Sequence, residues 1–350
     1  MSENIQLPER ARLRWGVNLQ RATYADAAAR DEQLSRLAAL GVTVGRIGLP
    51  WAWAEHTQGQ YDWRHADSLV AAMEKHGIMP LVDLGNVPVW ARPAGTPETF
   101  GPNTDELRQG FATYCTALAK RFKDRIYAYE IWNEANGDFW YPKPNMGDYS
   151  KLFVASYHAL KAGDPSAPIV TTGMAGNTAI ADTLSWTRAF VRTEAMELAD
   201  GFGFHPYSNG DGKVSGVLLE TAFVRQILDE AGFAHVPMYM TETGISTHSS
   251  RGVSEAMQAK VLRVTADWLS TIHGVNCVLW YCDMDSADIQ ARNPADPEGY
   301  FGLWRADGSA KPAVEEFASQ INKVLPAGSV PANWWSYDGT SYIHLSSPPA

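Results

Sequence analysis

Two glutamates stand at the ends of short runs that are typical of buried strands. Glu134 ends the run YEIWNE at 129–134, and Glu242 ends the run MYMTE at 238–242. Because side chains alternate along a strand, we expect Glu134 to share the inward face with Glu130 and Trp132. On the other strand, we expect Glu242 to share the inward face with Met238 and Met240. Two facing carboxyl groups suit the hydrolysis of a glycosidic bond, in which one protonates the leaving oxygen and the other attacks the sugar carbon or activates water. A single acidic residue at a strand end is more often a surface charge or a cap, so the pair supports the interpretation better than either residue alone.

The elements that position this pair follow a regular alternation. Short apolar, β-branched or aromatic runs alternate with longer segments of helical period, which is typical of βα units around a parallel sheet. The predicted strands are 14–18, 42–49, 79–84, 126–132, 168–172, 201–205, 237–241 and 277–282. The predicted helices are 31–40, 65–76, 104–122, 149–162, 181–197, 217–231, 254–272 and 312–324.

Eight such units predict a (β/α)8 barrel, an α/β fold, as one domain over residues 1–325. We expect residues 326–350 to form a tail that packs on the barrel as a short strand pair. An open, doubly wound sheet is the alternative, but the chain has no Gly-rich dinucleotide fingerprint after its first strand. In a barrel the chemistry lies at the C-terminal ends of the strands, where both glutamates are expected.

The composition narrows the class of protein. With 29 Lys and Arg against 39 Asp and Glu, the net charge of −10 argues against a nucleic-acid binder. The 3 cysteines are too few and too scattered for a disulfide scaffold or a zinc site. No long apolar run predicts a membrane span or a signal peptide, so we expect a chain that is cytoplasmic or exported with its signal absent from this sequence.

The 13 Trp residues and the aromatic loops indicate a ligand with flat apolar faces, such as a sugar. Three long loops follow the third, fourth and eighth predicted strands, at 85–103, 135–148 and 283–310. If these loops share one mouth of the barrel, their aromatic side chains line a cleft; the alternative is that they pack within their own loops. The residues concerned are Trp90, Phe100, Phe139, Trp140, Tyr141, Tyr300 and Trp304.

Both glutamate motifs resemble those of clan A of the glycoside hydrolases, the retaining barrels with catalytic residues on strands four and seven. The WNE run at 132–134 resembles the acid/base motif of that clan, and the TETG run at 241–244 resembles its nucleophile motif. Within the clan, the stretch 130–136 and the FHPY turn at 204–207 look most like family 39 and related bacterial endoglycosidases, with family 5 second. Ala135 stands where family 39 usually has proline.

The resemblance implies a role for each matching residue. Glu134 becomes the general acid and then base, and Glu242 becomes the nucleophile. Asn133 would bind the sugar 2-hydroxyl, and Arg46 would contact the nucleophile. Glu130 lies deeper on its strand, where we expect it to pair with a buried cation.

Further supporting residues follow from the same comparison and from the aromatic loops. The resemblance implies that Tyr207 binds the nucleophile, that His205 helps to fix the site and that Trp280 forms the floor beneath the sugar. From the loops, Trp90 and Trp140 are expected to contact substrate. We expect a monomer that uses no metal or cofactor.

These observations predict a retaining glycoside hydrolase that acts on a β-linked poly- or oligosaccharide, endo-acting in view of its long loops, with an exo-acting enzyme left open. Retention requires carboxyl groups about 5–5.5 Å apart, and a separation above about 6.5 Å would count against the assignment of Glu242. One alternative is a metal-dependent sugar isomerase or epimerase, with ligands from Asp83, Glu134, His205, Glu242 and Asp283. Another is a carbohydrate-binding barrel without catalytic activity.

Overall fold

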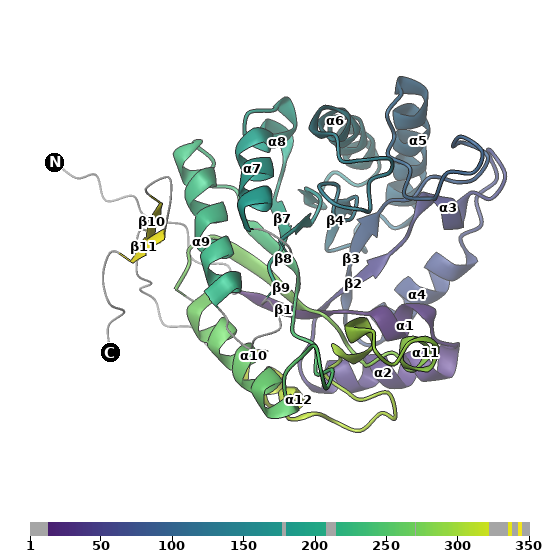
Figure 1. The fold of residues 1–350 in the computed structure, drawn as a ribbon. Coiled ribbons are helices and arrows are strands. Elements are labelled where there is room, and N and C mark those ends of the chain that lie inside the picture. The colour runs from purple at the N-terminus through teal and green to yellow at the C-terminus, as the bar shows by residue number, and fades with distance from the viewer. Residues whose placement is uncertain are drawn as a thin grey trace.

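The computed structural model of the chain is a ring of parallel strands enclosed by helices (Figure 1). It describes residues 13–176, 180–207, 215–269, 271–321, 335–337 and 342–344. The strands of the ring are β1 (Arg14–Asn18), β2 (Val44–Gly48), β3 (Met79–Leu84), β4 (Ala128–Ile131), β5 (Ile169–Val170), β6 (Met174–Ala175), β7 (Phe202–His205), β8 (Met238–Thr243) and β9 (Val275–Trp280). Their order in the sheet is β5-β4-β3-β2-β1-β9-β8-β7-β6.

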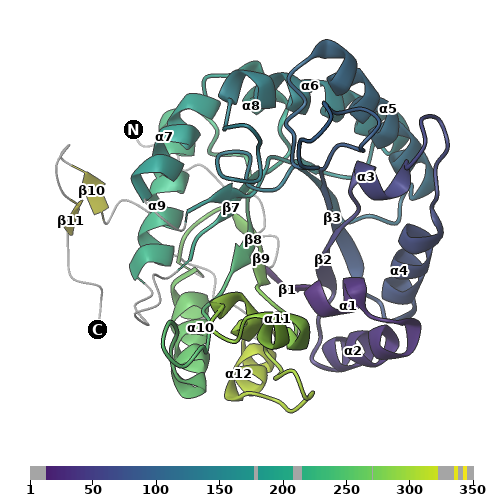
Figure 2. The same cartoon turned by 45° about the vertical axis from the view of Figure 1, so that its right-hand side comes forward.

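The helices lie outside this ring, as the turned view in Figure 2 shows. Long helices follow most strands: α2 (Ala27–Ala39), α4 (Arg64–Lys75), α5 (Asp105–Arg121), α6 (Met146–Gly163), α7 (Ile180–Phe190), α9 (Ser215–Glu230), α10 (Glu255–Leu269) and α12 (Pro312–Ile321). Shorter helical segments lie in the connections: α1 (Gln20–Tyr24), α3 (Trp51–Ala54), α8 (Glu194–Leu198), α11 (Ala287–Arg292) and η1 (Pro297–Tyr300). The alternation of strands and helices confirms the predicted (β/α)8 barrel.

The fifth position of the barrel is filled by two short strands, β5 and β6, which lie at opposite ends of the strand order. Single bridges close the ring there: Val170 pairs with Gly201, and Asn133 pairs with Gly173. The sequence predicted one strand at 168–172 in this place and missed β6, because a two-residue strand leaves no periodic pattern. The barrel is therefore continuous but is most thinly paired at its fifth position.

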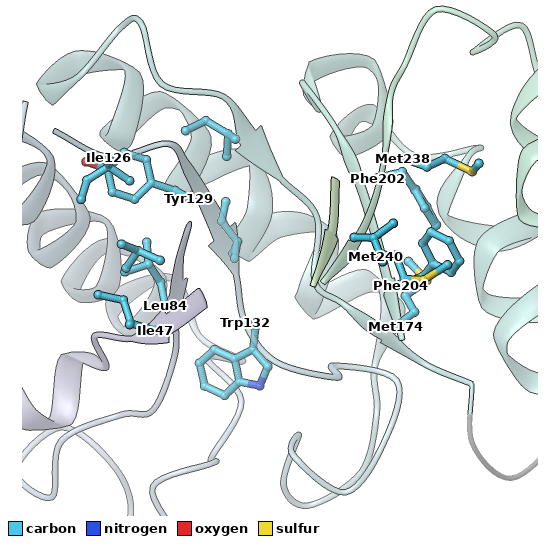
Figure 3. Packing of buried hydrophobic residues seen from close by; sticks show 14 of the residues in the cluster. Ile47, Leu84, Ile126, Tyr129, Trp132, Met174, Phe202, Phe204, Met238 and Met240 are labelled. Atoms are coloured by element: carbon cyan, nitrogen blue, oxygen red, sulfur yellow. The ribbon is translucent and has the colours of Figure 1, made fainter. Parts of the chain in front are cut away.

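Two apolar cores explain which side chains face inward. One core fills the barrel interior with residues from strands alone, namely Val44, Leu81, Ala128, Val170, Tyr239, Cys277 and Leu279. The larger core packs the outer faces of the strands against the helices. Figure 3 shows part of this outer core, with Ile47, Leu84 and Tyr129 in one group and Phe202, Phe204, Met238 and Met240 in another.

This division corrects the expected alternation on the strand that carries Glu242. Met238 and Met240 face the helices, while Tyr239 faces the interior. A register irregularity between Met240 and Thr243 interrupts the alternation, so Glu242 reaches a cavity at the C-terminal ends of the strands although it has the parity of outward residues. The expectation that Met238 and Met240 point inward was therefore wrong, although Glu242 does reach the mouth.

The loop after β9 is held against the barrel by a buried ion pair. Lys311 Nζ lies 2.7 Å from Asp285 Oδ1 and also donates to Thr247 Oγ1 at 2.9 Å and to the Tyr300 carbonyl at 3.1 Å. Burial of such a pair costs desolvation energy, which these additional hydrogen bonds help to offset. The loop that walls one side of the cavity is therefore fixed in place.

Two short strands, β10 (Trp335–Tyr337) and β11 (Tyr342–His344), form an antiparallel pair in the tail, as expected there. Their side chains and the rest of the tail lie outside the described residues, so the packing of residues 326–350 on the barrel stays a prediction. Within the described part of the chain, no helix has the length and apolar character needed to cross a bilayer.

Candidate active site

A cavity of about 540 Å³ opens at the C-terminal ends of the strands. Both expected catalytic glutamates line it, together with residues from the ends of β1, β2, β3, β7, β8 and β9. In a barrel of this kind the loops that follow the strands build the reactive site. The site therefore lies where the sequence placed it.

An unusual backbone presents Glu134 to the cavity. Strand β4 ends at Ile131, and both Trp132 and Glu134 then take positive φ angles, of 70° and 44°. The backbone N–H of Glu134 donates to the Gly173 carbonyl at 3.1 Å, so this turn is tied to the fifth barrel position. Positive φ is strained for non-glycine residues and is often found at functional sites.

The same turn sends Trp132 outward, into the core beside Phe111 of α5. The expectation that Trp132 shares the inward face with Glu130 and Glu134 was therefore wrong. The strand ends before that alternation reaches Glu134, and the left-handed residues set the direction of its side chain.

Glu242 is held by two donors. Arg46 Nη1 donates to Oε1 at 2.7 Å, and the Tyr207 hydroxyl donates to Oε2 at 2.7 Å. Burial alone would raise the pKa of Glu242, but the charges of His205 and Arg46 and these two hydrogen bonds outweigh it, so the pKa lies below its usual value. The carboxyl group is thus kept ionised, as a nucleophile requires.

Arg46 links the acidic groups beneath the cavity. Its Nε donates to Glu130 Oε2 at 2.6 Å and its Nη2 donates to Asn133 Oδ1 at 2.9 Å. Burial lowers the pKa of Arg46, but the negative charges of Glu130, Asp83 and Glu242 more than reverse this effect and raise it. Glu130 therefore pairs with a buried cation, as the sequence predicted, and Asn133 is oriented with its amide N–H group left for a ligand.

His205 lies behind Glu134 in the barrel interior. Its Nδ1 lies 2.9 Å from Glu134 Oε1, and its Nε2 lies 3.0 Å from the Thr241 hydroxyl, which donates to Glu130 Oε1 at 2.7 Å. Burial lowers the pKa of His205, but the charge of Glu242 and the interaction with Glu134 outweigh it and raise the pKa. A Cβ atom at Gly173 would lie 2.0 Å from His205 Nε2, so only glycine leaves room for this ring.

Glu134 and Glu242 face each other at short range. One oxygen of each carboxyl group and one nitrogen of His205 all lie within 4.8 Å of one another. Three such ligand atoms have the spacing of a metal site, but a cation there would lie beside the Arg46 guanidinium that already binds Glu242. The arrangement fits a pair of catalytic carboxyl groups better than a metal centre.

The expected supporting residues divide into two groups. Arg46, Asn133, His205 and Tyr207 all converge on the two glutamates. Trp280, in contrast, lies in the outer core, because Cys277 and Leu279 take the inward parity on β9. The next residue, Tyr281, lines the cavity instead.

Two expected tryptophans also lie away from this cavity. Trp140 is buried against Trp132 and Tyr149. Trp90 packs edge-on against Trp51 and lines a separate hollow over the start of α5. For these residues, packing within the loops describes the contacts better than the predicted cleft does.

Of the other loop aromatics, Phe139 lines the catalytic cavity, as expected. The lining residues that sequence reasoning missed include Tyr24, Tyr281, Glu298 and Phe301. Tyr24 ends α1 in the connection after β1, where the sequence predicted no site residue. Tyr281 was the one residue with a usable signal, because it follows the inward parity of β9.

The comparisons with known proteins identify the family of the chain. The family model described as cellulase, glycosyl hydrolase family 5, matches residues 16–286. A curated relative, endo-1,4-beta-xylanase 3 of Hypocrea jecorina, is 27% identical over 137 residues, which cover 37% of this chain and 37% of the relative.

Several solved structures share the fold. A family 39 glycoside hydrolase from Bacteroides cellulosilyticus WH2 superposes with a TM-score of 0.73 at 23% identity, covering 89% of this chain and 64% of that chain. A family 5, subfamily 18 protein from Streptomyces cattleya, in complex with Manb1-4GlcNAc, gives a TM-score of 0.71 at 20% identity, covering 90% and 82%. The chain thus spans less than two thirds of the xylanase and of the family 39 protein. Because the family model extends over most of the barrel and includes both glutamates, the chain belongs to glycosyl hydrolase family 5, in clan A.

Proposed function

We propose that the protein is a retaining glycoside hydrolase that cleaves β-glycosidic bonds in a poly- or oligosaccharide. The observation that supports this most directly is the approach of Glu134 and Glu242 to within 4.8 Å, with Glu242 held by Arg46 and Tyr207. Retaining enzymes hold their carboxyl groups about 5–5.5 Å apart, whereas inverting enzymes leave about 6.5–9.5 Å for a water molecule.

In the first step, the ionised Glu242 attacks the anomeric carbon while Glu134 gives its proton to the leaving oxygen. The bond from carbon to the leaving oxygen breaks, and an ester between the sugar and Glu242 forms. The N–H group of Asn133, oriented by Arg46, donates to the sugar 2-hydroxyl. This hydrogen bond strengthens in the transition state.

In the second step, Glu134 acts as a base. It takes a proton from water, the water oxygen attacks the anomeric carbon, and the ester to Glu242 breaks to restore the carboxylate. The configuration of the sugar is therefore inverted twice and retained overall.

The hydrogen bonds around His205 hold Glu134 in position. Glu130 pairs with Arg46, so the Thr241 hydroxyl gives its hydrogen to Glu130 and accepts one from His205 Nε2. The other ring nitrogen, Nδ1, lies 2.9 Å from Glu134 Oε1. His205 thus fixes the direction of the Glu134 carboxyl group relative to the leaving oxygen.

The relatives and the cavity support one substrate class before others. The xylanase, and the subfamily 18 structure with its bound Manb1-4GlcNAc, point to β-1,4-linked chains as the first candidates. An exo-beta-1,4-mannosidase from an Opitutaceae bacterium also shares the fold, with a TM-score of 0.64. We propose an endo-acting monomer that does not bind nucleic acid, in keeping with its net charge of −10.

Reducing-end release from β-1,4-linked xylan, mannan and glucan tests the proposal, with Glu242→Gln as the matched inactive variant and a chelator arm. We expect the rate of hydrolysis to be unchanged by the chelator and to fall by roughly 10⁴-fold or more in Glu242→Gln. Turnover that depends on a metal would favour the isomerase alternative. Glycan binding without turnover would favour a binding protein.

A further inference from the structure

The catalytic cavity continues into a second hollow that contains neither Glu134 nor Glu242. The two cavities share Tyr24, Gly48, Asp83, Asn86, Asn133 and Phe139. Beyond this junction the second cavity extends over the ends of β2 and β3, to Pro50, Trp53 and Gly85, and it is bordered by the buried Trp132. The first cavity alone, at about 540 Å³, is in the size range of sites that hold ligands larger than a single sugar.

Asp83, the penultimate residue of β3, lies at the junction and lacks a partner for one of its oxygens. Within the described part of the chain, Oδ1 is buried and makes no hydrogen bond. The nearest cationic atom to its other oxygen is Arg46 Nη2 at 3.9 Å, which is too far for a hydrogen bond. A buried polar oxygen without a partner costs free energy. The Asp83 side chain as a whole is 21% exposed and lines both cavities, so a ligand hydroxyl group can reach its carboxyl group.

The charge state of Asp83 is compatible with such a contact. Burial raises its pKa, the charge of Arg46 opposes this and the charges of Glu130 and Glu242 add to it, giving a value of about 7. At that value the carboxyl group accepts a hydrogen bond from a sugar hydroxyl group when ionised and donates one when protonated.

Two exposed aromatic side chains flank the same junction. Tyr24 is 68% exposed and Phe139 is 48% exposed. Tyr24 packs edge-on against Trp53 at 5.7 Å between ring centres, and Trp53 packs in turn against His65 at 5.7 Å. Tyr24 is thus supported from behind although it is open to solvent, as expected of a platform for the apolar face of a sugar.

The position of Asn133 shows which side of the scissile bond this junction serves. Asn133, oriented by Arg46, binds the 2-hydroxyl of the sugar that Glu242 attacks, and it lines both cavities, whereas Glu134 lines only the first. The junction lies across Asn133, over β2 and β3. It therefore faces the part of the substrate that stays bound to Glu242 after the first step.

We propose that the linked cavities bind two neighbouring sugars on this non-leaving side, with the Asp83 carboxyl group bound to a hydroxyl group of the sugar at the junction and Tyr24 and Phe139 against its ring. This inference rests on the proposed function and deepens it. The substrate then contributes at least two sugars to this side, and the enzyme releases disaccharides or longer products in preference to single sugars.

The test compares kcat/KM for paired 4-nitrophenyl β-glycosides: xyloside and xylobioside, mannoside and mannobioside, glucoside and cellobioside. For the hydrolysed pair, we expect Asp83→Asn and Tyr24→Ala each to lower the ratio of kcat/KM on the disaccharide to kcat/KM on the monosaccharide by roughly tenfold. Tyr141→Ala is the matched control, because Tyr141 is a half-exposed tyrosine of the β4 loop that lines neither cavity. Equal effects on both substrates, or none on the disaccharide, would overturn the inference.

Binding measured on Glu242→Gln separates this inference from the proposed function. Xylotriose, mannotriose and cellotriose are titrated calorimetrically into Glu242→Gln and into the same variant with Tyr24→Ala. A roughly tenfold weaker binding with Tyr24→Ala supports the subsite even if the native chain hydrolyses none of the glycosides, a result that would reject the proposed function alone. Unchanged binding alongside normal hydrolysis in the native chain rejects the subsite alone.

Discussion

An oxygen of Glu134 and an oxygen of Glu242 lie within 4.8 Å of each other across the cavity. This separation leaves no room for a water molecule to attack from the face opposite the leaving group, so the first product should be the β-anomer. Proton NMR of the sugar released in the first minutes of hydrolysis measures this directly. An α-anomer formed first would show that Glu242 is not the nucleophile.

Tyr207→Phe removes one of the two donors to Glu242. The pKa of Glu242 is held below its usual value in part by this bond, so its loss should raise that pKa and move the acidic limb of kcat/KM to higher pH by roughly one unit. The pH profile of each variant provides the measurement. Tyr281→Phe is the control within the same cavity, because its hydroxyl donates to Glu298 and not to Glu242; an equal shift there would contradict the assignment.

Gly173→Ala should displace the His205 ring, because the new Cβ atom would lie 2.0 Å from Nε2. We expect a loss of about 1–3 kcal/mol in unfolding free energy and a fall in kcat of about 10²-fold or more, since Glu134 loses its partner. Denaturant unfolding and kinetics on one preparation check both effects. Gly137→Ala, in the β4 loop where a Cβ atom has ordinary contacts from 3.6 Å, should leave kcat within about twofold.

The charge of the cavity predicts a preference for neutral sugars. Its charged or ionisable carboxyl side chains are Asp83, Glu134, Glu242 and Glu298, and its Arg46 is already bonded to Glu130 and Glu242. An aryl glucuronide should therefore have a kcat/KM at least about tenfold below that of the matching glucoside at low salt. Glu298→Gln should reduce the difference in kcat/KM between the glucoside and the glucuronide. A glucuronide that is hydrolysed as fast as the glucoside would contradict the electrostatic reasoning.

Glu220 of α9 makes stability depend on pH. Within the described residues both of its carboxyl oxygens are buried without a hydrogen-bond partner, and burial raises its pKa to about 8. The folded chain binds the proton of Glu220 more tightly than the unfolded chain does, in which the pKa of a glutamate is near 4.3. The resulting contribution to the free energy of unfolding is present in full below that pKa and is lost as the pH rises through about 8. The unfolding free energy should thus fall across this range by a few kcal/mol, at up to about 1.4 kcal/mol per pH unit.

Glu220→Gln should make the free energy of unfolding depend less on pH. Denaturant unfolding at about pH 5, 6.5 and 8 samples the titration and measures this change. Glu230→Gln, an exposed glutamate on the same helix, serves as the control and should keep the slope of the native chain. An unaltered slope in Glu220→Gln would mean that other groups cause the dependence.

The layout of the barrel could be predicted because its strands and helices are long enough to show their period. Strands β1 and β3 have the predicted bounds, and the two glutamates proposed as catalytic lie in short motifs that could be read from the sequence. The face of the strand toward which each side chain points was harder to predict. Trp132, Met238 and Met240 were assigned to the inward face from the parity of Glu134 and Glu242. Left-handed residues and a register shift interrupt the alternation before each glutamate, and neither leaves a clear pattern in the sequence.

The choice of aromatic residues shows the same limit. Trp90, Trp140 and Trp280 are prominent in the sequence but pack elsewhere, whereas Tyr24 and Tyr281 line the cavity. A tryptophan brings a large apolar area to a core and to a sugar site alike, so residue type alone does not separate the two uses. Strand parity, once the inward core is known, does separate Trp280 from Tyr281.

The split fifth strand places the catalytic acid at the seam of the barrel. Across this seam the backbone N–H of Glu134 donates to the Gly173 carbonyl, and the backbone N–H of Gly176 donates to the His205 carbonyl. The contacts of Arg46 with Glu242 and Glu130 lie away from the seam. Short strands joined by single bridges are the segments expected to exchange their amide hydrogens first in native-state exchange. Partial opening there would separate Glu134 from His205 and leave Glu242 in place. Heating should therefore abolish the proposed activity at a lower temperature than the one at which the whole barrel unfolds.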